Sequence, residues 1–179
     1  MPVKNCYFNV RFNEKFEVVR ENGEIISDAL LIRNGREIFL GQSKTTPLNT
    51  SPQNLEGEYV FGGHLIYHFG HFLLESLARI CFLKESNLPI LWVVPGNFQG
   101  LKPWQEDIFC LLGIDVNRFQ YATCATSVEQ LWVQPPQYVI GGHFTERHRE
   151  ACACVAAEPR GGKIWISRSA LAPGLGGWI

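Results

Sequence analysis

The spacing of hydrophobic and polar positions divides the chain into two parts. In the first part, short apolar runs alternate with polar residues and turn signals, which is typical of antiparallel strands. The expected strands span residues 7–11, 16–20, 25–31 and 37–40. Asn22-Gly23 and Asn34-Gly35 have the composition of two-residue hairpin loops. We therefore predict a small antiparallel β region over residues 1–50, as a subdomain or as an extension of a larger sheet.

After a loop rich in Thr, Pro, Asn and Ser at 45–57, apolar strands alternate with helical periods. Strands are expected at 58–61, 89–94, 119–122, 129–133, 138–140 and 163–167, and helices at 67–84, 103–112 and 145–157. Gly113 is the expected C-terminal cap of the second helix, and Thr145 the N-terminal cap of the third. This alternation predicts an α/β fold over residues 51–179, a Rossmann-like parallel sheet with helices on both faces.

One stretch of the chain concentrates polar residues that could carry chemistry. Three of the five histidines fall within eight residues. If the stretch is a single helix, its polar members form one narrow stripe on an otherwise apolar surface. The members of this stripe are His64, His68, His71, Glu75 and Arg79. Such a helix would be buried on most sides, with the stripe facing a crevice.

Two plainer interpretations of the stripe stay open. A row of polar residues can be an ordinary solvated helix face, with Glu75 and Arg79 as an i,i+4 ion pair. In addition, Gly70 weakens the middle of the expected helix. If the helix begins near Phe69 instead, His64 and His68 lie on the loop that leads into it.

A pair of glycines follows two of the expected strands. Residues 59–64 read Tyr-Val-Phe-Gly-Gly-His, and residues 138–143 read Tyr-Val-Ile-Gly-Gly-His. Glycines at the carboxyl end of a strand let backbone amides approach a phosphate. A tight turn from strand to helix also favours glycine, and neither copy is the G-x-G-x-x-G fingerprint.

Composition narrows the functional classes. The chain is 46% hydrophobic and 12% aromatic, which is enough for a substantial core, and its net charge of −1 gives no electrostatic argument for binding nucleic acid. Its longest apolar run, 88–94, is far shorter than the ~20 residues that span a bilayer, and no apolar signal segment follows the N-terminus. The scattered cysteines, without a CxxC pair, indicate reduced structural residues. We therefore expect a cytoplasmic protein without a transmembrane segment.

The spacing of the histidines is also compatible with a zinc site. His64, His68 and His71 could converge on one ion. However, the chain has no H-E-x-x-H motif, and Glu75 follows the histidines rather than separating them. We expect neither a metal nor a cofactor.

The histidine-rich stretch resembles the signature of glycosyltransferase family 61, which includes capsular-polysaccharide-type bacterial enzymes. The similarity lies in Gly62-Gly63, a polar-aromatic pair, and Gly-His-Phe-Leu-Leu-Glu-x-Leu-x-Arg over residues 70–79. His68-Phe69 stands where that family commonly has Asn-Tyr. Gln105-Glu106 with 112–114, and the segment 163–168 that ends in Ile-Ser-Arg, are similar to later segments of the family.

The resemblance implies the N-terminal, acceptor-side lobe of a GT-B-like enzyme that acts in polysaccharide biosynthesis. Such an enzyme transfers a sugar from a nucleotide-sugar donor to a glycan acceptor with inversion. Because the chain ends soon after an expected strand, we expect that the C-terminal lobe is missing and that the chain alone is inactive. Inversion needs a base on the acceptor hydroxyl, for which we expect Glu75 or His71, which are four residues apart. We expect substrate contacts at Gly62, Gly63, His64, His68, Arg79 and Arg168.

Partners and alternatives follow from the same resemblance. The nucleotide sugar is a co-substrate rather than a cofactor, and peripheral membrane association and oligomerisation stay open. The alternative is a non-catalytic carbohydrate- or protein-binding module left by truncation. A third hypothesis is a metal-dependent hydrolase built on the histidines.

Overall fold

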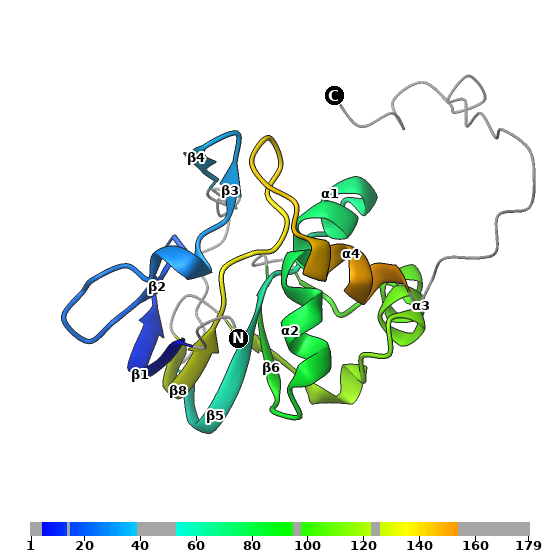
Figure 1. The fold of residues 1–179 in the computed structure, drawn as a ribbon. Helices are drawn as coiled ribbons and strands as arrows, with labels where there is room; N and C mark the ends of the chain where they lie inside the picture. Colours follow the sequence, from blue (N-terminus) through cyan, green and yellow to red (C-terminus); the bar gives the residue numbers. More distant parts are fainter. Residues whose placement is uncertain (1–4, 14, 39–52, 95–97, 123–125, 154–179) are drawn as a thin grey trace, which may run out of the picture.

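The computed structural model describes residues 5–13, 15–38, 53–94, 98–122 and 126–153. It has a mixed α/β fold with a six-stranded sheet, a separate two-stranded sheet and a group of helices (Figure 1). Within these ranges, every helix is too short or too polar to cross a membrane.

Parallel pairing forms the centre of the large sheet, whose strand order is β2-β1-β8-β5-β6-β7. Its members are β1 (Asn5–Phe12), β2 (Val18–Val19), β5 (Gln53–His64), β6 (Ile90–Val93), β7 (Phe119–Ala122) and β8 (Thr126–Val133). Strand β5 pairs in parallel with β6 and β8, and β6 pairs in parallel with β7. Strand β1 is antiparallel to both β8 and β2. The N-terminal strands thus extend the parallel sheet at one edge.

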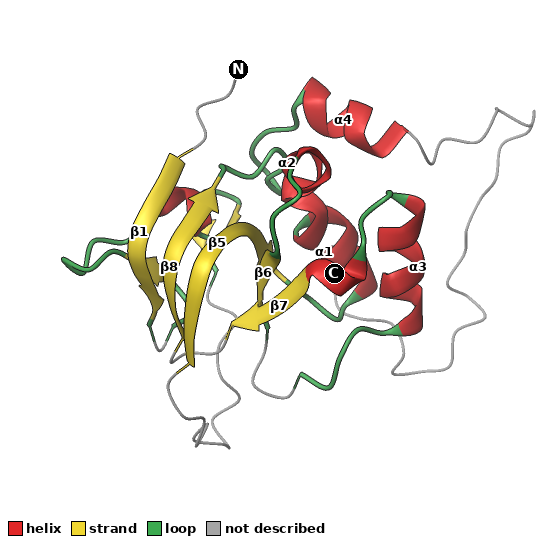
Figure 2. Ribbon diagram, turned by 90° about the horizontal axis from the view of Figure 1, so that it is seen from below, coloured by secondary structure: helices red, strands yellow, loops and turns green. Residues whose placement is uncertain are grey.

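The described α-helices lie on one side of the large sheet (Figure 2). They are α1 (Phe69–Leu74), α2 (Ile80–Glu85), α3 (Pro103–Leu111) and α4 (Glu146–Cys152). The core on the opposite face is closed by the N-terminal segment, through Phe16, Ile26 and Ala29. Ala29 belongs to the 3-10 helix η1 (Ser27–Ala29). The prediction of helices on both faces is therefore wrong for the described part of the chain.

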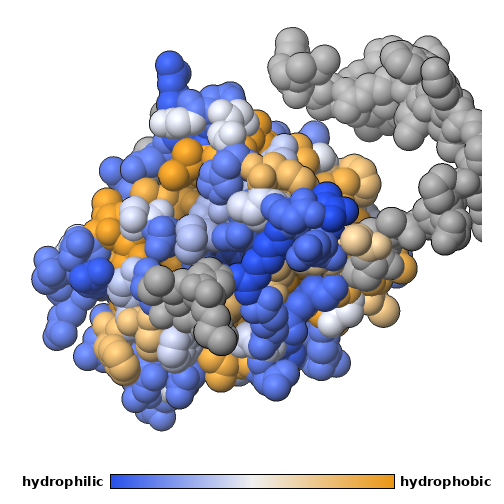
Figure 3. Space-filling model, in the orientation of Figure 1, coloured by the Kyte–Doolittle hydropathy of each residue, from blue (hydrophilic) through white to orange (hydrophobic). Residues whose placement is uncertain are grey.

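The outermost helix, α4, presents a charged surface to solvent. Figure 3 shows hydrophilic side chains gathered over α4 on the face of the molecule drawn in Figure 1. On the solvent side, Arg149 pairs with Glu146 within α4, whereas the half-buried Arg147 pairs with Glu85 of α2. The opposite side of α4 packs through Ala151 and Cys152 against the core on the helical side of the sheet. This division of polar and apolar sides is that of an ordinary surface helix.

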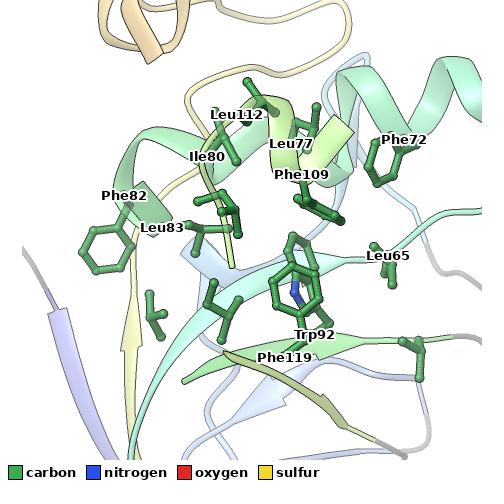
Figure 4. Packing of buried hydrophobic residues seen from close by; sticks show 14 residues of the cluster. Leu65, Phe72, Leu77, Ile80, Phe82, Leu83, Trp92, Phe109, Leu112 and Phe119 are labelled. Carbon is green, nitrogen blue, oxygen red and sulfur yellow. The ribbon is translucent and has the colours of Figure 1, made fainter. Parts of the chain in front are cut away.

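The large sheet has a hydrophobic core on each face, and the side chains of β6 point alternately into one and the other. In β6, Ile90 and Trp92 face the helices, whereas Leu91 and Val93 face the N-terminal segment. Figure 4 shows Trp92 next to Phe109 of α3 and Phe119 of β7, whose ring centroids lie 5.5 and 5.4 Å from it and 4.8 Å from each other. This aromatic group fixes α3 against the sheet.

Several local predictions are confirmed. Asn34 and Gly35 connect β3 (Ile32–Arg33) to β4 (Arg36–Glu37) with positive φ at both residues, as a type I′ turn requires. Gly113 ends α3 as expected: it has φ +75°, and the Ile114 amide donates to the Phe109 carbonyl at 2.9 Å, as in a Schellman motif. Thr145 caps α4 by accepting a hydrogen bond from the His148 amide at 3.2 Å.

Other predictions need correction. The expected helix over 67–84 begins only at Phe69 and is interrupted by the 3-10 helix η2 (Ser76–Arg79). Residues 138–140, expected as a strand, form one side of a turn, in which Tyr138 forms an isolated antiparallel β-bridge with Phe144. The segment 27–29, expected in a strand, is η1. The strand expected at 163–167 and Arg168 lie outside the described residues.

Candidate functional site

The expected polar stripe splits into two groups. His64 is the last residue of β5, and α1 begins only after His68. Beyond Glu75, η2 turns by roughly 20° more per residue than an α-helix, so Arg79 is rotated away from the side that carries His71. The prediction of one continuous stripe is therefore wrong, and each group has its own surroundings.

The first group is a buried carboxylate beside a partly exposed imidazole. The Glu75 side chain is 3% exposed, and its Oε2 lies 2.7 Å from Nδ1 of His71. The same carboxylate accepts two hydrogen bonds from Arg33, from Nε to Oε1 at 2.9 Å and from Nη2 to Oε2 at 2.8 Å. We call Arg33, His71 and Glu75 the clamp cluster.

The clamp cluster determines where the proton of His71 sits. A carboxylate that accepts both hydrogen bonds from a guanidinium uses its lone pairs as acceptors. The hydrogen in the 2.7 Å contact between Glu75 and His71 therefore comes from Nδ1. Arg33 Nη2 lies 3.2 Å from the same Nδ1, but with hydrogens on both nitrogens the two donate to Oε2 rather than to each other. When the ring is neutral, its lone pair is therefore on Nε2, the atom that can accept a proton.

This arrangement distinguishes the two candidate bases. Both oxygens of Glu75 already accept hydrogen bonds, and the carboxylate is buried. His71 is 36% exposed and has the lone pair. The geometry favours His71 as the proton acceptor and Glu75 as the residue that orients it.

Arg33 was missed by the sequence analysis. It lies 42 residues before Glu75, on β3 of the small hairpin. Its position directly before the Asn34-Gly35 turn was visible in the sequence, but no local pattern links it to a helix that follows two strands later.

His68 lies next to the clamp cluster. It is exposed, occupies the position before the first residue of α1, and its ring centroid is 5.1 Å from that of His71. The structure thus brings together three of the expected residues, His68, His71 and Glu75. The exposed side chains of Phe69 and Leu74 also show that α1 is not buried on most sides.

Two buried side chains fix the connection from β5 to α1. The Ser76 hydroxyl donates to the His64 carbonyl at 2.8 Å and accepts from the Ile66 amide at 2.9 Å. Gln105 of α3 donates to the Ile66 carbonyl at 3.1 Å and accepts from the Lys102 amide at 3.0 Å. The segment that carries His68 is therefore held from both sides.

His64 belongs to the second group, in the core. It is 6% exposed, and its ring packs edge-on against Phe61 at a centroid distance of 6.3 Å. Burial, together with the smaller effect of the Arg79 cation, lowers the pKa of His64 to about 3, and a hydrogen bond with the Phe16 backbone acts in the opposite direction. His64 is therefore a neutral core residue that does not line the clamp cluster.

Arg79 is the other buried member. Its Nε donates to the Gln134 carbonyl at 2.9 Å, its Nη2 donates to the Asp28 carbonyl, and its guanidinium carbon lies 5.1 Å from the centre of the Phe61 ring. Burial lowers the pKa of Arg79 to about 10. These contacts connect η2 to η1 and to the end of β8, in place of the expected pair with Glu75.

Gly62 and Gly63, at the end of β5, make room for neighbouring side chains. A Cβ on Gly62 would lie 2.6 Å from the Trp92 ring. Gly63 has φ +104°, and a Cβ there would lie 3.0 Å from Nη1 of Arg79. These contacts account for both glycines without a bound phosphate, and their contact with substrate stays a prediction.

The histidine-rich stretch borders neither of two surface hollows and, in the described residues, forms no metal site. Two surface hollows, of about 650 and 610 Å³, lie against β1, and no residue of the histidine-rich stretch lines them. Within the described ranges, no three His, Cys, Asp or Glu side chains are grouped closely enough to hold a metal ion. His64, His68 and His71 do not converge.

Comparisons with protein-family models, curated proteins and solved structures gave no match, so the functional argument depends on the residues themselves.

Proposed function

We propose that this chain is the acceptor-side lobe of an inverting glycosyltransferase, with His71 as the general base. The observation that carries the proposal is the contact of Glu75 with Nδ1 of His71, held by Arg33. A carboxylate that fixes the tautomer of a partly exposed imidazole is the arrangement that proton abstraction from a hydroxyl needs. The sugar substrate comes from the resemblance to family 61.

In this reaction the acceptor hydroxyl gives its proton to Nε2 of His71 while its oxygen attacks the anomeric carbon of the donor. The bond from that carbon to the nucleoside diphosphate breaks, and the electron pair leaves with the diphosphate. Glu75 stabilises the imidazolium that forms. Attack opposite the leaving group inverts the anomeric configuration.

The order of the parallel strands supports a GT-B-like architecture. The first three parallel strands of the chain lie side by side in the order β7-β6-β5, which is the 3-2-1 order of one half of a Rossmann sheet. Ligands of such sheets bind at the carboxyl ends of the strands. His68 and His71 follow the carboxyl end of β5 directly.

The remaining roles are part of the same proposal. His68, beside His71, would contact the acceptor. The donor nucleotide would be held by a C-terminal lobe, with cationic or amide groups on the diphosphate. The setting would be cytoplasmic polysaccharide biosynthesis.

The test is acceptor-dependent release of nucleoside diphosphate from a panel of nucleotide sugars, with NMR of the anomeric configuration of the product. It should be run on this chain and on the full reading frame that encodes it. We expect turnover with inversion in the complete protein, and its loss in His71→Ala. His143→Ala is the matched control, because the ring of this exposed histidine bonds to the Pro136 carbonyl and lies outside the clamp cluster. Glycan binding without any turnover would instead favour the non-catalytic module.

A further inference from the structure

The second glycine pair of the sequence lies in a turn rather than at a strand-to-helix junction. Tyr138 forms a β-bridge with Phe144, and the Val139 amide donates to the His143 carbonyl at 2.9 Å. Gly141, near the tip, has φ +69°. The proposed function assigns no role to this turn.

The turn docks on the β3–β4 hairpin, more than 100 positions earlier in the chain. Figure 1 shows the two loops next to each other, beside the amino end of α4. Arg33 forms an isolated parallel β-bridge with Ile140, and the Asn34 amide donates to the Ile140 carbonyl at 2.7 Å. A Cβ on Gly141 would lie 1.9 Å from Oδ1 and 3.2 Å from Cα of Asn34. Asn34 therefore occupies the space that the missing side chain of Gly141 leaves.

This contact sets the position of Arg33. The hairpin has only two paired positions in each strand, which is too little to be stable alone. Arg33 directly precedes Asn34, so the backbone that docks on the turn also carries the guanidinium that reaches Glu75. A displacement of Asn34 would move both hydrogen bonds from Arg33 to Glu75.

We propose that Asn34 and Gly141 are positioning residues, which hold Arg33 on Glu75 and thereby keep the proton of His71 on Nδ1. The effect on catalysis rests on the proposed function; the effect on the His71 tautomer does not. The two hypotheses can therefore fail separately.

The test is Gly141→Asn, with Gly23→Asn as its control. Asparagine tolerates positive φ better than other residues, so both variants carry similar backbone strain. Gly23 has φ +85°, and a Cβ there would have nothing within 4 Å, whereas the new Cβ at 141 meets Asn34. The readouts are the ¹⁵N NMR signals of the His71 ring and the solvent exchange of the Arg33 Nε hydrogen.

We expect a single Nδ1–H tautomer in the unmodified protein and in Gly23→Asn. In Gly141→Asn both tautomers should appear, and exchange at Arg33 should be about tenfold faster or more, because its hydrogen bond to Glu75 opens. Unchanged signals in a folded Gly141→Asn, or equal changes in Gly23→Asn, would overturn the proposal.

A rescue variant covers the case in which Gly141→Asn does not fold. Asn34→Gly removes the atoms that the new Cβ meets first and suits a type I′ turn. The double variant Asn34→Gly, Gly141→Asn should therefore fold and regain the single tautomer. A double variant that does not fold, or that folds with mixed tautomers, would contradict the proposal.

Discussion

Glu75 and His71 are one helical turn apart and in contact at 2.7 Å, but they differ in exposure, 3% for Glu75 and 36% for His71. The buried member is tied to Arg33, whose side chain is 27% exposed. Substitution of His71 therefore removes a partly exposed ring, whereas substitution of Glu75 disrupts a buried ion pair. Activity and stability should respond differently to the two changes.

The first prediction concerns activity. In the proposed glycosyltransferase, His71→Ala should lower kcat by roughly 10² to 10⁴, the usual contribution of a general base, with little change in melting temperature. His68→Ala, which removes the exposed neighbour, should mainly raise KM. Steady-state kinetics of both variants give the comparison. If His71→Ala kept its kcat, His71 would not be the base.

The second prediction concerns stability. Glu75→Gln leaves the Arg33 guanidinium without its carboxylate, and Arg33→Met leaves a buried carboxylate without its guanidinium. Each should lower the free energy of unfolding by about 2 kcal/mol or more. Urea denaturation should show that the double variant loses less than the sum of the two single losses. Fully additive losses would mean that the two groups do not depend on each other.

Local signals in the sequence were enough for the turns and caps. Asn34-Gly35, Gly113 and Thr145 each act within a few residues of themselves, so their conformations could be predicted from composition alone. The apolar run of β6 and its place in a parallel sheet were likewise predictable.

Contacts between distant segments were not predictable in the same way. The ion pair of Arg33 with Glu75 depends on where a hairpin docks, and no spacing in the sequence encodes that. The helical periodicity of the sequence also did not reveal the 3-10 helix at Ser76–Arg79. Over four residues, the hydrophobic patterns of an α-helix and a 3-10 helix are nearly the same. Coverage of the second sheet face by the N-terminal segment through Phe16 follows from tertiary packing alone.

The third prediction is a pH dependence of stability from His64. Its pKa in the folded protein is lowered to about 3, from 6.5 for an unperturbed histidine. Between these values the unfolded chain binds a proton that the folded protein excludes, so the free energy of unfolding falls as the pH falls. From pH 7 to pH 5 the loss should be about 2 kcal/mol.

The matched variant for this measurement is His64→Gln, which cannot titrate. Burial also lowers the pKa of His148, but that histidine is present in both proteins and its effect cancels in the comparison. Denaturation curves at several pH values should show a shallower slope for the variant. Equal slopes would mean that His64 is accessible to protons in the folded state.

The last prediction separates two glycines eight positions apart in the histidine-rich stretch. Gly62→Ala should destabilise the protein by about 1 to 3 kcal/mol, because the new methyl group would lie 2.6 to 2.9 Å from atoms of the Trp92 ring. Trp92 is fully buried and packs against Phe109 and Phe119, so the ring cannot move without disturbing the core. Gly70→Ala should instead stabilise by about 0.5 to 1 kcal/mol, since it lies within α1 and its nearest neighbour, the His68 ring, is 3.8 Å from the new Cβ. Urea denaturation of both variants measures the difference. If Gly62 served mainly to let a phosphate approach the backbone, Gly62→Ala would keep its stability and lose ligand binding, and the packing explanation of this glycine would be wrong.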